Sequence, residues 1–254
     1  FVEYDGGMLL NKIPNFDNKG MFYESLRYFN YGVGELLHFY FVLRQFNSQK
    51  AEKFLDLEKI AKAFVSMAYF TGKADNPITF VNFGDSFIDE SLSVFALKEY
   101  YDKTGLKTVM QKNVLLAKYL LLLGAKAKGL KTIYNCKQTD FDVFDFIYND
   151  VLRQNLNEND YPAVKDYIYK DSGYAFIKKS SKKGSTLLAV RSGYTWNHAH
   201  DDAGSFVIYD NGAPLFIDSG TVTYSNPLYL SYFSTARAHN GILVNKEGQP
   251  NSNS

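Results

Sequence analysis

Apolar residues in the first half of the chain recur at steps of three and four, which is the spacing of one face of an α-helix. The clearest case is a helix predicted from Met21 to about Asn47. Its apolar face is formed by Leu26, Phe29, Val33, Leu36, Leu37 and Tyr40. The same spacing predicts further helices over residues 50–70, 88–101, 106–123 and 140–152. A succession of helices with short connections favours a helical first half.

From about residue 173 onward, apolar and polar residues alternate, as they do in half-buried β-strands. The predicted strands are 174–178, 186–191, 205–209 and 214–217. Hairpin turns are predicted at Lys182-Lys183-Gly184 and Asp210-Asn211-Gly212, and the Asn-Gly pair is the strongest local signal. Residues 71–77 are predicted as a turn and residues 157–171 as a linker. The second half is therefore predicted to be an antiparallel sheet.

The helix predicted over 21–47 has a second face that is polar and aromatic. This face is formed by Glu24, Tyr28, Tyr31, Glu35 and His38, at alternating steps of four and three. A helix with one apolar face and one face of acid, phenol and imidazole could line a cleft. By spacing alone, a solvated face is the favoured interpretation.

Composition excludes several classes of protein. The 254 residues carry a formal net charge of +1, so no strongly basic field indicates nucleic-acid binding. The longest apolar run, 114–125, contains Lys118 and is too short to span a bilayer. Cys136 is the single cysteine, so no disulfide can form within the chain. The 20 tyrosines and 21 phenylalanines suit an ordinary core first and an aromatic sugar-binding cleft second.

The ends of the sequence indicate a piece of a longer protein. The chain starts at Phe1 within what reads as structured sequence, and no signal peptide is visible. It stops soon after the apolar run 242–244, which reads as a strand in need of partners. The length suffices for two modest domains.

Three of the four histidines gather late in the chain, at His198, His200 and His239. The first two belong to the segment N-H-A-H-D-D-A-G-S-F, and in an extended strand they would project from the same face. Asp218 ends a later β-like run. Two imidazoles and a carboxylate from separate strands can bind one divalent metal, and zinc is the usual ion. Unrelated polar residues at strand ends are the alternative, but the clustering favours a site.

At these residues the sequence resembles the heparinase II/III-like polysaccharide lyases. That family carries an N-H-x-H-x-D-A-G-S-F type of segment, then a strand ending in D-x-G, then a segment ending in R-x-x-x-H-N. This chain has Asn197–Phe206, Asp218-Ser219-Gly220 and Ala236–Asn240, the last with its arginine slightly displaced. The order and spacing of three separate motifs make the resemblance specific.

The resemblance implies an α+β fold of two domains. Residues 1–160 would form an incomplete (α/α) toroid, and residues 161–254 a truncated antiparallel β-sandwich. It also implies a periplasmic or secreted protein. The sequence does not indicate the oligomeric state.

The resemblance further implies cleavage of uronate-containing polysaccharides by β-elimination, with heparan sulfate and alginate among the polymers that the family serves. The toroid of the family carries an E-G-P-x-Y-x-x-Y segment whose first tyrosine is catalytic. Glu24–Gly32 is similar, with Ser25-Leu26 in place of G-P. Tyr28 is therefore the implied acid/base, and Tyr31 is the second choice. A phenol with a pKa of about 10 can act as a base if nearby positive charge lowers that pKa.

Roles for the remaining candidates also follow from the resemblance. His198 would neutralise the uronate carboxylate or act as a second base. A structural divalent metal, zinc by its donor set, would be bound by His200, Asp218 and His239, with ligand distances of about 2.0–2.2 Å. Substrate contacts would come from Glu24, Asn82, Asn197, Tyr224 and Tyr229. Asp85 matches an N-x-G-D segment of the family, although Asp85 or Ser86 as the cap of the next helix is the favoured interpretation.

Two other classes of protein remain to be weighed. A non-catalytic glycan-binding protein of the same fold would have lost Tyr28 or His198, and the presence of both favours an enzyme. A metal-dependent hydrolase would need a glutamate base beside the metal, as in H-E-x-x-H, which the sequence lacks. Because a fold alone does not establish activity, the interpretation depends on these residues.

Overall fold

The computed structural model describes residues 16–54, 63, 66, 68–73, 79–88, 166–182, 184–193 and 198–248. Apart from residue 88, the helices predicted over 88–101, 106–123 and 140–152 lie outside this part of the chain. The (α/α) toroid and the division into domains at residue 160 therefore stay predictions.

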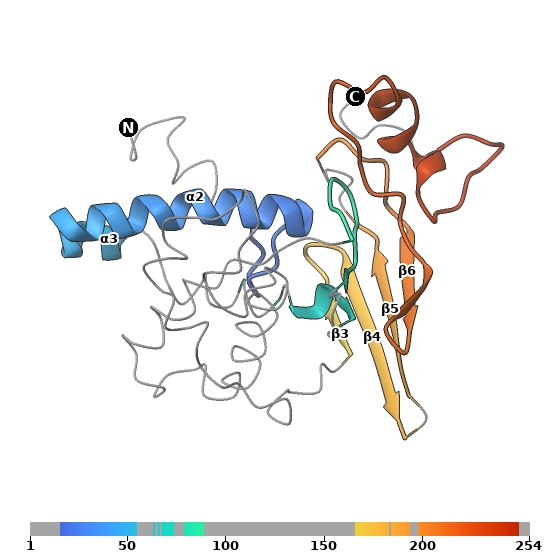
Figure 1. The fold of residues 1–254 in the computed structure, drawn as a ribbon, viewed down its shortest axis with the longest axis horizontal. Helices are drawn as coiled ribbons and strands as arrows, with labels where there is room; N and C mark the ends of the chain where they lie inside the picture. Colours follow the sequence, from blue (N-terminus) through green and yellow to red (C-terminus); the bar gives the residue numbers. More distant parts are fainter. Residues whose placement is uncertain are drawn as a thin grey trace, which may run out of the picture.

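A long helix, α2 (Ser25–Phe46), is followed by a short one, α3 (Ser48–Phe54) (Figure 1). The helix predicted here is confirmed, although it begins at Ser25 and not at Met21. Its buried side chains include four that the spacing of three and four selects: Leu26, Phe29, Leu36 and Tyr40. Ahead of the helix, the rings of Phe16 and Phe22 pack edge to face with centroids 5.0 Å apart. Apolar packing therefore fixes the start of α2.

A small ribbon follows the helical segment. The 3-10 turn η2 (Ala68–Phe70) leads into β1 (Thr71–Lys73), which pairs antiparallel with β2 (Thr79–Phe80). The turn predicted over 71–77 is therefore wrong for residues 71–73, which form a strand. The segment 81–88 then runs from β2 toward the end of the main sheet.

The second half forms a five-stranded antiparallel sheet with its strands in chain order. The strands are β3 (Tyr167–Tyr169), β4 (Tyr174–Ser181), β5 (Gly184–Arg191), β6 (Ser205–Asp210) and β7 (Ala213–Phe216). The predicted antiparallel sheet is thus confirmed, and its last four strands occur where the alternation places them. The linker predicted over 157–171 is wrong at β3, because Tyr167 and Tyr169 pair with Phe176 and Tyr174 across the ladder.

The turn between β6 and β7 shows why the Asn-Gly signal is reliable. Asn211 and Gly212 both have positive φ, +49° and +75°. A two-residue hairpin turn of this type needs left-handed backbone at both positions, which asparagine and glycine tolerate best. The side chain of Asn211 also accepts a hydrogen bond from the backbone N–H of Ser185, at 2.8 Å.

The two faces of the sheet are both apolar, and the described residues bury one of them more fully than the other. On the inner face, the rings of Tyr174 and Phe176 are buried against Phe70, with centroids 5.3 and 5.0 Å apart. The outer face carries a cross-strand row of Ile177, Leu188, Ile208 and Phe216 in register. Among the described residues this row stays partly open to solvent, with Phe216 52% exposed.

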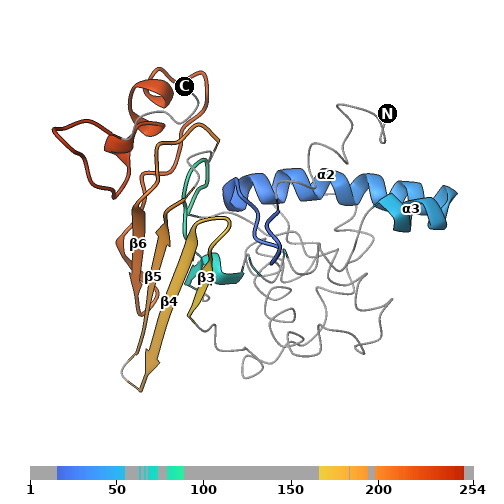
Figure 2. The same ribbon diagram turned by 180° about the vertical axis from the view of Figure 1, so that it is seen from behind.

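The helix meets the sheet end-on. In two opposite views, the first turn of α2 lies beside one end of the sheet and α3 lies far from it (Figures 1 and 2). The chain after β7 continues over that end of the sheet through two short helical turns, η6 (Tyr229–Phe233) and η7 (Ala236–Ala238). The start of α2 and the loops of the sheet therefore face each other.

Candidate active site

The first turn of α2 is anchored from outside the helix. Its N-cap, Glu24, makes no side-chain cap, and Ser25 has a φ of +87°. The hydroxyl of Ser86 accepts a hydrogen bond from the backbone N–H of Arg27, at 3.2 Å, and donates to the hydroxyl of Ser25, at 3.0 Å. Because this N–H is one of those that a helix start leaves unpaired, Ser86 supplies the missing cap. Tyr28 is thus held at the end of α2 that meets the sheet.

The segment carrying His198 and His200 is not an extended strand. His198 and Ala199 have φ angles of +52° and +68°, so the backbone turns through the left-handed region between the two imidazoles. The expectation that both project from one face is therefore wrong. Positive φ at residues other than glycine is strained and is often found at functional sites.

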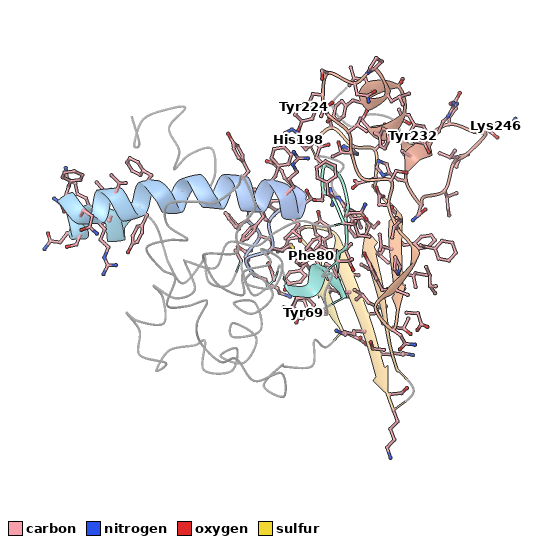
Figure 3. The ribbon with its side chains drawn as sticks, in the orientation of Figure 1. Tyr69, Phe80, His198, Tyr224, Tyr232 and Lys246 are labelled. Atoms are coloured by element: carbon pink, nitrogen blue, oxygen red, sulfur yellow. The ribbon has the colours of Figure 1, made fainter. Side chains whose placement is uncertain are left out.

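The turn sends the two imidazoles to different environments. His198 is partly exposed and stacks on the ring of Tyr28, with centroids 3.8 Å apart and an interplanar angle of 22°. Figure 3 shows His198 beside Tyr224, close to the start of α2. His200 is fully buried behind it. The structure therefore brings together Tyr28 from the helix and His198 from the loop between β5 and β6.

Asp85 lies between the two histidines. Its Oδ1 atom is 2.6 Å from Nε2 of His200 and accepts a hydrogen bond from the hydroxyl of Thr221 at 2.7 Å. Its Oδ2 atom accepts from the hydroxyl of Tyr224 at 2.6 Å and is 3.8 Å from Nε2 of His198. From sequence, Asp85 was favoured as a helix cap, whereas the structure places it at the centre of the site.

The charge of Asp85 fixes the direction of these hydrogen bonds. Burial raises the pKa of this carboxyl, but hydrogen bonds from His200, Tyr224 and Thr221 outweigh burial and leave the pKa below its usual value. An ionised carboxylate only accepts hydrogen bonds, so its three partners must donate. The single proton of the Tyr224 hydroxyl is then directed to Asp85. The hydroxyl of Tyr28 contacts that of Tyr224, so in this pair Tyr28 is the donor.

Tyr28 is consequently in its neutral form. Burial raises the pKa of Tyr28, and the charges of Asp85 and Glu24 add to this, against an opposing contribution from Arg27. The nearby positive charge of Arg27 lowers the pKa of Tyr28, but by too little to make the phenolate the resting form. Tyr28 therefore holds a proton that it can donate.

His239 joins His200 to Asp218 on the buried side of the site. Nδ1 of His239 lies 3.0 and 2.9 Å from the two carboxylate oxygens of Asp218. Nε2 of His239 lies 3.3 Å from Nδ1 of His200. Asp85 holds the proton of His200 on Nε2, and Asp218 holds the proton of His239 on Nδ1. The two remaining nitrogens, Nδ1 of His200 and Nε2 of His239, therefore face each other with their lone pairs. Such a pair needs a cation between its nitrogens, which a proton or a metal ion can supply.

The facing nitrogens fit a metal ion. Neighbouring ligands of a tetrahedral zinc with Zn–N bonds of about 2.0–2.1 Å lie roughly 3.3–3.4 Å apart, and the two nitrogens are 3.3 Å apart. Asp218 contacts the opposite nitrogen of His239, where a carboxylate orients the imidazole. Within the described residues, no three acidic, histidine or cysteine side chains already surround one point. The three-residue metal set, His200, Asp218 and His239, stays a prediction.

The D-x-G motif explains how Asp218 is held. Its oxygens accept hydrogen bonds from the hydroxyl of Ser205 at 3.0 Å and from the backbone N–H of Gly220 at 2.9 Å. Gly220 has a φ of +65°, and a Cβ there would lie 2.8 Å from the carbonyl oxygen of Ser86. Glycine is therefore required both for the backbone and for the close approach of the segment 81–88.

The predicted substrate-binding residues are placed as follows. Oε2 of Glu24, which is buried, lies 3.5 Å from Nδ1 of His198. The side-chain amide of Asn82 donates to the carbonyl oxygen of Asp218 at 2.9 Å. The hydroxyl of Tyr229 lies 3.4 Å from Oδ2 of Asp85. With Tyr224, which donates to Asp85, four of the five predicted substrate-binding residues therefore belong to the same connected cluster.

Other predicted residues are not brought into the cluster. Tyr31, the second choice for the acid/base, is 65% exposed. Asn197 lies outside the described residues, as does the side chain of His38. Sequence reasoning understated Asp85 and did not identify Thr221 or Ser205. The N-x-G-D segment was the available signal for Asp85, whereas a lone threonine or serine gives none.

Residues 167–253 match the family profile described as "Heparinase II/III-like, C-terminal". This stretch is similar to the C-terminal region of the heparinase II/III-like proteins. It contains β3 to β7 together with His198, His200, Asp218 and His239, so the resemblance given by the motifs is confirmed. No curated protein matches the chain.

Solved structures extend the likeness of fold beyond the heparinase II/III-like region. Heparan sulfate lyase HepC from Pedobacter heparinus is 13% identical with a TM-score of 0.59, covering 94% of this chain and 32% of its own. Heparinase III is 18% identical with a TM-score of 0.59, covering 94% of this chain and 34% of its own. At these identities the likeness concerns the fold. The chain spans about a third of the length of those proteins.

Proposed function

We propose that this chain is part of a polysaccharide lyase that cleaves uronate-containing glycans by β-elimination. The observation that carries the proposal is the stacked pair of Tyr28 and His198, a neutral phenol and an imidazole 3.8 Å apart between their ring centroids. The names of the similar structures, a heparan sulfate lyase and a heparinase, support an acidic glycan as substrate.

The reaction needs three operations at adjacent atoms. A base removes the proton from C5 of the uronate, the C4–O bond breaks as a C4=C5 double bond forms, and an acid protonates the departing oxygen. The negative charge that develops at the uronate carboxylate must also be stabilised. Groups from both sides of one sugar ring can meet these requirements if they lie within hydrogen-bond reach of it.

Tyr28 is the acid in this proposal. Its hydroxyl is neutral, donates toward Tyr224, and lies in a partly exposed position. A substrate oxygen that replaces Tyr224 as acceptor would receive the same proton. If His198 takes the C5 proton, Tyr28 acts as the acid alone. If His198 instead neutralises the carboxylate, Tyr28 must first lose its proton to solvent, after which it takes the C5 proton and passes it to the departing oxygen.

His198 is the second participant. Its side chain is 31% exposed and covers the ring of Tyr28, so it faces the same space. There it neutralises the uronate carboxylate or takes the C5 proton. The two roles differ in what they require, because an amide can bond a carboxylate but cannot serve as a base.

Of the predicted metal set of His200, Asp218 and His239, the two facing nitrogens of His200 and His239 would hold a divalent metal directly. Asp218 would orient His239, and Asp85 would orient His200. The ion would supply a fixed positive charge that joins the sheet segments. This role is structural, and it leaves proton transfer to Tyr28 and His198.

The location of the protein is also part of the proposal. Acidic polysaccharides of this class are extracellular polymers, which favours a periplasmic or secreted enzyme. In the described part of the chain, no helix combines the length and apolarity needed to cross a bilayer.

The decisive experiment incubates the full-length protein with a panel of acidic polysaccharides. The expected result is a rise in ultraviolet absorbance from the 4,5-unsaturated uronate, with at least one polymer. Binding of a polymer without any unsaturated product would overturn the proposal in favour of a non-catalytic glycan-binding protein.

A further inference from the structure

Asp85 belongs to neither of the two groups of predicted catalytic and metal-binding residues, yet it touches both. It is 1% exposed and lies on the segment after β2, far in sequence from its partners on the heparinase II/III-like region. Its two oxygens are divided between two tasks. Oδ1 faces the buried histidine, His200, and Oδ2 faces Tyr224.

We propose that Asp85 is a positioning residue that orders both halves of the site by fixing two hydrogen-bond directions. Oδ1 holds the proton of His200 on Nε2, which leaves the lone pair on Nδ1 toward His239. Oδ2 makes Tyr224 a donor, so that Tyr224 accepts from Tyr28. This inference rests on the proposed lyase function for its kinetic consequences only.

A carboxylate at this position has a property that an amide lacks. Two carboxylate oxygens can accept from both sides at once, and at Asp85 the donors are 2.6 Å away on each side. An asparagine has one accepting oxygen and one donating nitrogen. Asp85→Asn must therefore lose or reverse the hydrogen bond on one side while keeping almost the same shape.

The arrangement also explains why the surrounding hydroxyls are present. Thr221 adds a donor to Oδ1 at 2.7 Å, and Tyr229 adds a longer contact to Oδ2 at 3.4 Å. These donors offset the cost of burying a charge and keep the carboxylate ionised. A helix cap would need none of them.

A double-mutant cycle in the full-length protein tests the tyrosine side. Asp85→Asn and Tyr224→Phe are each expected to lower kcat by about 10–100-fold with a smaller effect on KM, as loss of an orienting partner does. Because the two residues act in one chain, the double variant should lose much less than the product of the single losses. Losses that multiply would overturn the proposal.

Two further readouts separate positioning from a general loss of structure. Asp85→Asn is expected to weaken zinc binding by about 10–100-fold, whereas Tyr224→Phe should leave it unchanged. Asp17→Asn is the matched control, because Asp17 is also buried and accepts from two backbone N–H groups and from Ser172. It should lower the melting temperature and spare both kcat and zinc affinity.

The histidine side can be tested without any turnover. In protein with 15N-labelled histidine, His200 should show the Nε2–H tautomer, and Asp85→Ala, which removes both carboxylate oxygens, should shift it. An unchanged tautomer in the variant would overturn the proposal, whatever the activity. If wild-type protein cleaves no polysaccharide while the tautomer shifts as expected, the lyase function fails and the ordering by Asp85 stands.

Discussion

The two sides of the site differ in access to solvent more than in chemistry. Both contain an imidazole and a hydrogen-bonded carboxylate, and residues 198–200 deliver a histidine to each. On one side, His198 and Tyr28 are partly exposed and stacked. On the other, His200 and His239 are buried and face each other. Because of this difference, a substrate can reach only the exposed pair, and the buried pair can act only through its effect on the position of the exposed one.

The largest expected effect is on the open side. Tyr28→Phe removes the hydroxyl and keeps the ring on His198, so stability should change little. Turnover should fall by roughly 10²–10⁴-fold, the usual loss for a general acid/base. Initial rates on the best polysaccharide, with a thermal melt of each protein, measure both quantities.

Tyr31→Phe is the matched comparison for that experiment. Tyr31 lies one helical turn further along α2 and is largely exposed. Near wild-type turnover in Tyr28→Phe together with a loss in Tyr31→Phe would assign the acid/base role to Tyr31. It would also contradict the proposed catalytic role of the exposed pair.

On the buried side, removing a predicted metal ligand should mainly lower the free energy of unfolding. His239→Ala leaves Asp218 without its imidazole partner and takes one nitrogen from the facing pair. Loss of a buried, paired group of this kind costs about 3–5 kcal/mol. The free energy of unfolding, measured with and without a strong chelator, should fall in the wild type on chelation and show no further fall in the variant. Equal sensitivity of both proteins to the chelator would contradict the site.

His198 allows a finer distinction. His198→Gln keeps a neutral hydrogen-bonding group and removes the base. If His198 neutralises the uronate carboxylate, the glutamine variant should retain clearly more turnover than His198→Ala. Equal and severe losses in both variants would assign the C5 proton to His198, and ratios of kcat/KM measure the difference.

The smallest expected effect concerns Tyr229. Its hydroxyl lies 3.4 Å from Oδ2 of Asp85 and 3.4 Å from the carbonyl oxygen of His198, both long for a hydrogen bond, and its single proton can be donated to only one of them. Tyr229→Phe should therefore cost about 0.5–1.5 kcal/mol in transition-state stabilisation, roughly 2–12-fold in kcat/KM. A loss as large as that of Tyr28→Phe would show that Tyr229 takes part in proton transfer.

The sequence predicted the elements whose causes are local. Alternation along β5 and β6 predicted these strands, and Asn211-Gly212 predicted the turn after them, because each depends on neighbouring residues. The strand β3 was missed because its tyrosines gain their partners only by pairing with β4. Register across a ladder is not visible in so short a segment.

The site was predictable as a set of residues but not as a geometry. His198 and His200 were expected on one face, and left-handed backbone at two residues separates them. Asp85 meets His200 across 115 positions of sequence and Tyr224 across 139. No local pattern reports such contacts. The same holds for Asp218, whose place on the far nitrogen of His239 depends on how three segments pack.

The outer face of the sheet has a consequence for handling the protein. Its row of Ile177, Leu188, Ile208 and Phe216 ends at β7, an edge strand whose four residues are all exposed. An apolar face next to an open edge is a template for strand addition and self-association. Residues 166–248 taken alone would therefore show a melting temperature that rises with concentration, reporting assembly of copies and not the strength of a single fold.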